Sequence, residues 1–183
     1  LIQPGYKHIV YASLGKEFAD NCVICTSLSK TFNLAGLCYA SIIIPNDEVR
    51  AKFQKQMGLQ AFMHIERFGP VAHEAAYRHG AGWLEELIQV IKGNYEYVRD
   101  FFAQHFPGVV VTELEGTYLM WLNMKALGKS DDVYKALCSA GVGLSRGEGY
   151  GEPGQCDGYM RFNVACPRKQ LDMALDRMLV AYK

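Results

Sequence analysis

The clearest pattern of hydrophobic and polar positions along the chain lies between Gly82 and His105. Large apolar side chains recur there at steps of three and four residues, which places them on one face of a helix. They are Trp83, Leu84, Leu87, Ile88, Ile91, Tyr95, Val98, Phe101 and Phe102. Pro107 and Gly108 follow and end the pattern. The spacing predicts one long amphipathic helix over residues 82–105.

Shorter patterns after this helix predict a compact α+β domain. Strand-like runs occupy residues 109–111, 118–122, 142–145 and 159–165. Ser130 or Asp131 is expected to cap a helix that runs to about residue 140 and ends at Gly141. Pro167 is expected at the first position of a last helix. The predicted order is therefore β-β-α-β-β-α.

Two apolar, partly β-branched runs near the start of the chain, residues 22–26 and 37–44, are typical of buried strands. Pro45 and Asn46 end the second run. Asn46 is expected to cap a helix that reaches about Gly58, and Pro70 to open another short helix.

Lys30 lies on the connection between these two predicted strands. A lysine is rarely buried without a partner, so its amine either extends into water or has a chemical role. A desolvated lysine is the usual nucleophile toward a carbonyl carbon. Ser27 and Ser29 supply hydroxyl donors for an anionic group, and Asn33 accepts a left-handed backbone more readily than most residues. The residues alone leave both interpretations open.

Composition narrows the class of protein. Lys plus Arg and Asp plus Glu each number 19 in 183 residues, so the net charge is zero with neutral histidines. This balance argues against a nucleic-acid-binding surface. No apolar run reaches the length of a membrane span, and we expect no membrane partner. The length allows one domain or two small ones.

Six cysteines raise the question of metals and disulfides. Cys22 and Cys25 form a C-x-x-C, but residues three apart on a strand point to opposite faces and do not share one metal ion. His64, His73 and His79 lack the H-E-x-x-H spacing. We therefore expect no metal site, and reduced, buried cysteines in a cytoplasmic protein.

Arg161 lies within an alternating strand pattern. Alternation places it on the face of Tyr159 and Asn163, opposite Met160 and Phe162. The residues alone favour a solvent-facing arginine on a half-exposed strand. Residues 141–154 contain several glycines but no phosphate-binding pattern, which favours a mobile loop over a nucleotide site.

The segment Ser27–Leu37, S-x-S-K-T-F-N-L-A-G-L, resembles the segment of class I/II aminotransferases whose lysine binds pyridoxal 5'-phosphate (PLP). These are fold type I PLP-dependent enzymes. Further matches lie at residues 67–70, 75–77, 115–122 and 160–168. Together with residues 4–8 they are most similar to the cystathionine β-lyase-like C–S lyase subgroup. The resemblance covers essentially the whole chain.

The resemblance implies an α/β fold, the C-terminal portion of a fold type I PLP enzyme. Residues 1–80 would be a remnant of the large mixed-sheet, PLP-binding domain. Residues 81–183 would be the interdomain helix and a small α+β domain with an antiparallel sheet. The implied reaction is C–S β-elimination on a small amino-acid substrate, which releases a thiol, pyruvate and ammonia. A PLP-dependent aminotransferase is the alternative, and a homodimer is implied.

The resemblance also implies site residues. Lys30 would bind PLP covalently and then act as the base, Ser27 and Ser29 would contact the cofactor, and Arg161 would bind the substrate α-carboxylate. Cys38 stands where many members have a phosphate-binding arginine, although the lyase subgroup often lacks it. Ser27 is then the best remaining phosphate ligand in this chain.

A loop that borders the substrate is implied as well, with Arg146 and Tyr150 as candidate contacts. The alternative from another class of protein is a non-catalytic α+β interaction module, in which Lys30 and Arg161 are surface charges.

The resemblance further implies a missing N-terminal half of the same polypeptide. We therefore expect this chain alone to bind PLP weakly, to turn over poorly, and to self-associate or pair with that half.

Overall fold

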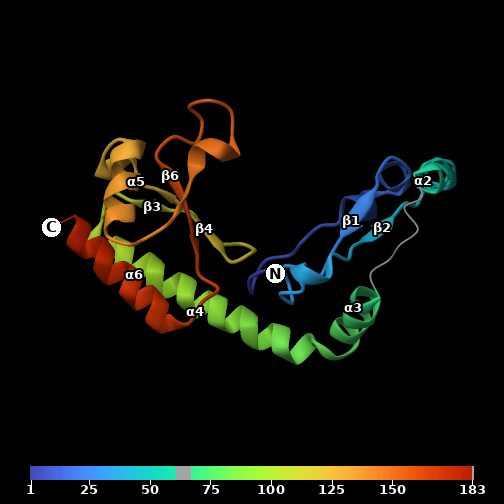
Figure 1. Cartoon of the computed structure of the whole chain (residues 1–183), viewed down its shortest axis with the longest axis horizontal. Coiled ribbons are helices and arrows are strands. Elements are labelled where there is room, and N and C mark those ends of the chain that lie inside the picture. The colour runs from blue at the N-terminus through green and yellow to red at the C-terminus, as the bar shows by residue number, and fades with distance from the viewer. Residues whose placement is uncertain (61–66, 183) are drawn as a thin grey trace. The chain divides into compact units, whose positions relative to one another are not determined.

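The structure is a computed structural model that describes residues 1–60 and 67–182, and it divides into two compact units (Figure 1). We call Lys7–Glu86 the N-terminal unit, and Leu1–Tyr6 with Leu87–Lys183 the C-terminal unit. Among the described residues, no helix has both the length and the apolar character that a membrane crossing requires.

The C-terminal unit contains the predicted β-β-α-β-β-α arrangement. Its strands are β3 Val110–Val111, β4 Leu119–Asn123, β5 Ser145–Arg146 and β6 Tyr159–Asn163, and its later helices are α5 Ser130–Ser139 and α6 Arg168–Ala181. The strands form one sheet in the order β3-β4-β6-β5, with every neighbouring pair antiparallel. The predicted small α+β domain with an antiparallel sheet is confirmed.

The core of this unit lies on one face of the sheet. The predicted alternation is confirmed, since Met160 and Phe162 of β6 are buried together with Met120 and Leu122 of β4. The long helix α4, Ala81–His105, matches its prediction closely. Figure 1 shows α6 running alongside α4. The buried Asn94 of α4 fixes the end of the sheet by donating to the carbonyl oxygens of residues 164 (2.8 Å) and 166 (2.9 Å).

Two helix starts differ from prediction. α5 is preceded by Lys129 and has no side-chain cap, because the Ser130 hydroxyl donates to Glu148 instead. Pro167 is the residue before α6 rather than its first residue. Gly141 does end α5 as predicted, with φ 78°.

In the N-terminal unit, β1 Ile24–Thr26 pairs antiparallel with β2 Ser41–Ile43. The other elements are the 3₁₀ turn η1 Tyr11–Leu14, the short helix α1 Lys16–Asp20, the 3₁₀ turn η2 Ala35–Leu37, α2 Asp47–Leu59 and α3 Phe68–His79. The Asn46 cap is confirmed, because its side chain accepts from the backbone N–H groups of residues 48 and 49. β2 is shorter than predicted, since η2 and a left-handed Cys38 (φ 45°) precede it.

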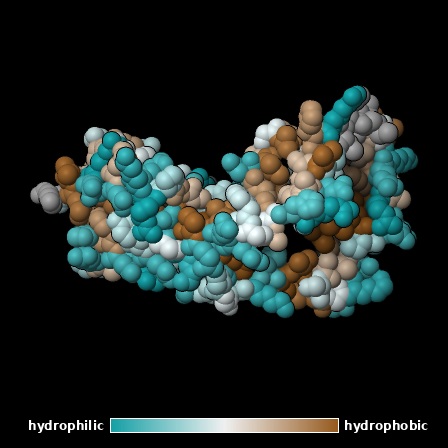
Figure 2. Space-filling model, turned by 90° about the horizontal axis from the view of Figure 1, so that it is seen from below, coloured by the Kyte–Doolittle hydropathy of each residue, from teal (hydrophilic) through white to brown (hydrophobic). Residues whose placement is uncertain are grey.

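The prediction that these two strands are buried is wrong for this chain. Ile42 and Ile43 of β2 are 47% and 49% exposed, and Val23 before β1 is 48% exposed. Figure 2 shows hydrophobic side chains at the surface of this unit, on the right of the view. The prediction of buried cysteines is wrong as well, because all six are half-buried or exposed. An apolar run predicts a buried strand only where other elements cover it.

Candidate functional site

Lys30 lies on a single helical turn that follows β1. The Phe32 N–H donates to the Leu28 carbonyl oxygen (2.9 Å), and the Leu34 N–H donates to that of Ser29 (3.0 Å). Asn33 takes the left-handed conformation (φ 56°) that allows the second bond, as predicted. Lys30 itself is exposed, and within the described ranges its amine forms no hydrogen bond or ion pair.

Side chains on either side of Lys30 fix this turn within the N-terminal unit. Leu28 is buried, and the Phe32 ring stacks on Trp83 at 5.6 Å between centroids. Gly80 makes room for that ring, because a Cβ at Gly80 would lie 2.5 Å from it. The turn is therefore held by packing, while the amine stays accessible.

The hydroxyl of Ser27 closes the base of the loop. It donates to the Tyr39 carbonyl oxygen (2.8 Å) and accepts from the Ser29 N–H (3.2 Å). A serine hydroxyl has one proton to donate, so this bond uses the donor that an anion would need. The Ser29 hydroxyl has no hydrogen-bond partner in the part of the chain that the structure describes. In this conformation Ser29, rather than Ser27, is the serine able to donate to an anion.

Arg161 lies in the middle of β6, on the sheet face opposite the core. Its cross-strand partners are Trp121 of β4 and Ser145 of β5. Its Nη2 donates to Ser145 Oγ (3.1 Å), and its guanidinium lies over the Tyr150 ring at 5.1 Å. Within residues 1–60 and 67–182, Arg161 forms no ion pair. A planar guanidinium has five N–H groups, so at least one pair remains for a carboxylate.

Arg146, which the sequence also suggested as a substrate contact, is already paired. Its Nη1 lies 2.7 Å from Asp131 and its Nη2 lies 3.0 Å from Glu148. These hydrogen bonds, with Glu148 first, raise the pKa of Arg146. The same arginine and the Ser130 hydroxyl lower the pKa of Glu148 to about 2. The charge of Arg146 is balanced, and Arg161 is the better candidate for binding an anion.

The aromatic groups around Arg161 did not emerge from the sequence as a set. Trp121 stacks on Tyr159 (5.5 Å, 19° between planes), and the Tyr150 and Trp121 rings meet edge to face with 5.6 Å between centroids. One signal was available: Tyr159 and Arg161 share a face by alternation. Trp121 is brought to that face by the pairing of β4 with β6, and the sequence does not reveal the register of this pairing.

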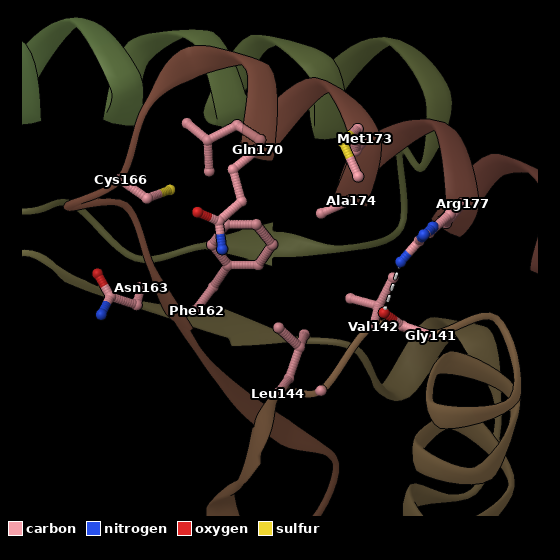
Figure 3. A pocket seen from close by; sticks show the side chains of 12 residues that line it. Gly141, Val142, Leu144, Phe162, Asn163, Cys166, Gln170, Met173, Ala174 and Arg177 are labelled. Carbon is pink, nitrogen blue, oxygen red and sulfur yellow. Dashed lines mark hydrogen bonds between the residues drawn. The ribbon is translucent and has the colours of Figure 1, made fainter.

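A further hollow lies elsewhere on the C-terminal unit. It has a volume of about 310 Å³ and lies between α6 and the segment before β5 (Figure 3). Phe162, Leu144 and Met173 line it, and Arg177 closes one end by donating to the Gly141 carbonyl oxygen (3.1 Å). Phe162 and Arg161 alternate along β6, so this hollow is not on the Arg161 face.

The predicted site residues thus fall into two groups. Ser27, Ser29 and Lys30 come together on one turn of the N-terminal unit, whereas Arg161 belongs to the C-terminal unit. The roles in one site that the resemblance implies for Lys30 and Arg161 stay a prediction. No three metal-binding side chains cluster in residues 1–60 and 67–182. His64, one of the histidines considered above, lies outside the described residues.

The antiparallel α+β unit, the Lys30 turn and Arg161 on β6 agree with what the resemblance to the C-terminal portion of fold type I PLP enzymes implies. The sequence profile of the family described as "Aminotransferase class I and II" matches residues 5–178, and the chain belongs to this family. The predicted family and fold class are confirmed.

The chain is 38% identical over 179 residues to "Cystathionine beta-lyase PatB" of Bacillus subtilis, and the aligned region covers 97% of this chain and 46% of that protein. Among solved structures, cystalysin of Treponema denticola, which contains PLP, superposes with a TM-score of 0.92 at 33% identity over 99% of this chain and 46% of its own. The PLP-bound C–S lyase of Staphylococcus hominis gives 0.87 at 28% identity, over 100% and 46%. The chain spans about half the length of these relatives.

Proposed function

We propose that the polypeptide containing this chain is a PLP-dependent enzyme that cleaves the C–S bond of a small amino acid by β-elimination. The observation that supports it most is the Lys30 turn, which exposes the Lys30 amine next to Ser29, whose hydroxyl has no hydrogen-bond partner among the described residues. The curated relatives favour the lyase reaction over transamination, since the aspartate aminotransferase of Pyrococcus horikoshii is only 23% identical.

The residues present fit PLP. Lys30 would hold the cofactor through its amine, and Ser29 would donate to an anionic oxygen of the cofactor, with Ser27 keeping the loop closed. PLP, when bound, supplies the electron sink for the electron pair at the substrate α-carbon. Lys30, once displaced by the substrate amine, would remove the α-proton.

Arg161 would bind the α-carboxylate through two parallel N–H groups and so fix the orientation of the α-carbon. The C–S bond then breaks, the sulfur leaves as a thiol, and uptake of one water yields pyruvate and ammonia. If no group left from the β-carbon, the amino group would instead be transferred to a keto acid, which is transamination.

The proposal includes the domain assignment expected above. Residues 1–80 would be part of the large PLP-binding domain, and residues 81–183 the interdomain helix and small domain. It also includes the homodimer and the cytoplasmic location implied by the resemblance. Light scattering on the full-length protein would test the dimer.

The test is an assay of the full-length protein with a thioether amino acid, in which pyruvate and thiol are measured together. We expect Lys30→Ala to lose at least about 100-fold in kcat. Arg161→Lys should raise KM about 10-fold, because an ammonium does not form the two-pronged pair. Lys52→Ala, which removes another exposed lysine, is the matched control.

Equal activity of Lys30→Ala and Lys52→Ala would refute the proposal. Amino-group transfer to a keto acid without thiol release would instead assign the aminotransferase reaction. A wild-type protein without either activity would favour the interaction module.

A further inference from the structure

Two neighbours fix the orientation of the Arg161 guanidinium. Ser145 is its register partner on β5, so strand pairing itself brings the Ser145 hydroxyl to Nη2 at 3.1 Å. Tyr150 comes from the loop between β5 and β6, and its ring lies 5.1 Å from the guanidinium carbon. A guanidinium over an aromatic face is attracted by the ring quadrupole.

The Tyr150 ring also contacts Trp121. The two rings are nearly perpendicular, at 86°, and Trp121 stacks in turn on Tyr159. Tyr150 remains 51% exposed, so it is a surface group held in place by strand residues and not part of the core. Tyr159, Trp121 and Tyr150 thus form a continuous series of aromatic contacts that ends on the Arg161 guanidinium.

The segment that carries Tyr150 is anchored to α5. Tyr150 ends the 3₁₀ turn η4, Gly147–Tyr150, in which Glu148 binds Arg146 and the Ser130 hydroxyl. Arg146 also pairs with Asp131 of α5. Gly147 is closely packed at the base of this turn, since a Cβ there would lie 2.4 Å from the Cys156 carbonyl oxygen. The turn is therefore fixed at both its first and its middle residues.

We propose that Tyr150 is a positioning residue for Arg161: it holds the guanidinium flat, so that the free N–H pair stays in one orientation for a carboxylate. The paired Arg146 anchors the turn and does not bind the substrate. That the carboxylate belongs to an amino-acid substrate rests on the proposed function, but the contact between Tyr150 and Arg161 does not.

The first test needs no activity. In the full-length protein, the Arg161 side-chain N–H signals should be shifted upfield in NMR spectra by the Tyr150 ring current. Tyr150→Phe should keep this shift, because Phe retains the ring, and Tyr150→Leu should abolish it. Tyr97→Leu is the control, since Tyr97 stacks on another arginine, Arg168, at 4.0 Å. An unchanged Arg161 signal in Tyr150→Leu would overturn the proposal.

The second test uses the full-length protein and a thioether amino acid. Tyr150→Leu should raise KM about 3- to 10-fold, the range that a partly exposed cation–π contact supports, with a smaller change in kcat. Tyr150→Phe should stay within about 2-fold of wild type, since most of the ring quadrupole remains. Equal KM values for Tyr150→Leu and Tyr97→Leu would overturn the positioning role. A wild-type protein without turnover would count against the proposed function, and the NMR result would still decide the contact.

Discussion

Arg146 and Arg161 lie on neighbouring strands, but their side chains have different partners. Arg146 is balanced by Asp131 and Glu148, whereas Arg161 meets a hydroxyl and an aromatic ring. A guanidinium without a carboxylate partner keeps its full attraction for an incoming anion. The sequence places Arg161 within one predicted strand and Arg146 directly after another, and only the register and the turn after β5 show which arginine is paired.

Glu148 should make stability depend on pH. Arg146 and Ser130 lower its pKa to about 2. Its contribution to the free energy of unfolding is therefore fully present above its ordinary pKa of 4.5 and is lost as pH falls toward 2. Glu148→Gln should lower the free energy of unfolding at pH 7 by about 1 kcal/mol or less, since the pair is partly exposed. Urea unfolding at several pH values measures this, and the difference from wild type should shrink below pH 4.5.

The matched control is Glu152→Gln. Glu152 lies just beyond the same turn, and its carboxylate forms no ion pair within the described ranges. We expect its difference from wild type to stay constant over that pH range. A Glu148→Gln difference that is equally independent of pH would show that the ion pair contributes nothing.

At the scale of elements, periodicity predicts long segments and loses short ones. α4 and the β-β-α-β-β-α order follow from apolar spacing over many residues. The five-residue α1 was not predicted, because such a helix is too short to repeat an apolar spacing. The start of β2 depends on Cys38 taking a left-handed conformation, which no residue preference indicates. Turns that depend on the conformation of a single residue could therefore not be predicted from the sequence.

The contact between Gly80 and Phe32 gives a prediction for the Lys30 turn. In Gly80→Ala the new Cβ would lie 2.5 Å from both the Phe32 ring and the Ala76 carbonyl oxygen. We expect a loss of about 1–3 kcal/mol in unfolding free energy, because the backbone oxygen has little room to move. Gly82→Ala is the control, since nothing lies within 4 Å of its added Cβ, and it should be neutral or stabilising by up to about 1 kcal/mol. Equal effects in thermal unfolding would contradict this packing.

At the scale of the molecule, the two units differ in how completely they bury apolar groups. The C-terminal unit has a continuous core, whereas the N-terminal unit exposes Ile9, Ile42, Phe68 and Val71 at 64%, 47%, 73% and 67%. Large exposed apolar patches mark surfaces that contact other protein. The chain also spans about half the length of its relatives.

The 183-residue chain expressed alone should therefore associate and bind a hydrophobic dye, and it should bind PLP more weakly than the full-length protein does. Analytical ultracentrifugation, dye fluorescence and PLP titration measure these three properties. A monomeric chain with no dye binding and full PLP affinity would show that the exposed groups need no further cover.

The central claim is that Lys30 carries the cofactor. The full-length protein should develop with PLP the yellow absorption band of a pyridoxal imine, and reduction with borohydride followed by peptide mapping should place the label on Lys30. Lys30→Ala should lose both the band and the label, and Lys52→Ala should keep them. A label spread over many lysines, or one that persists in Lys30→Ala, would contradict the account.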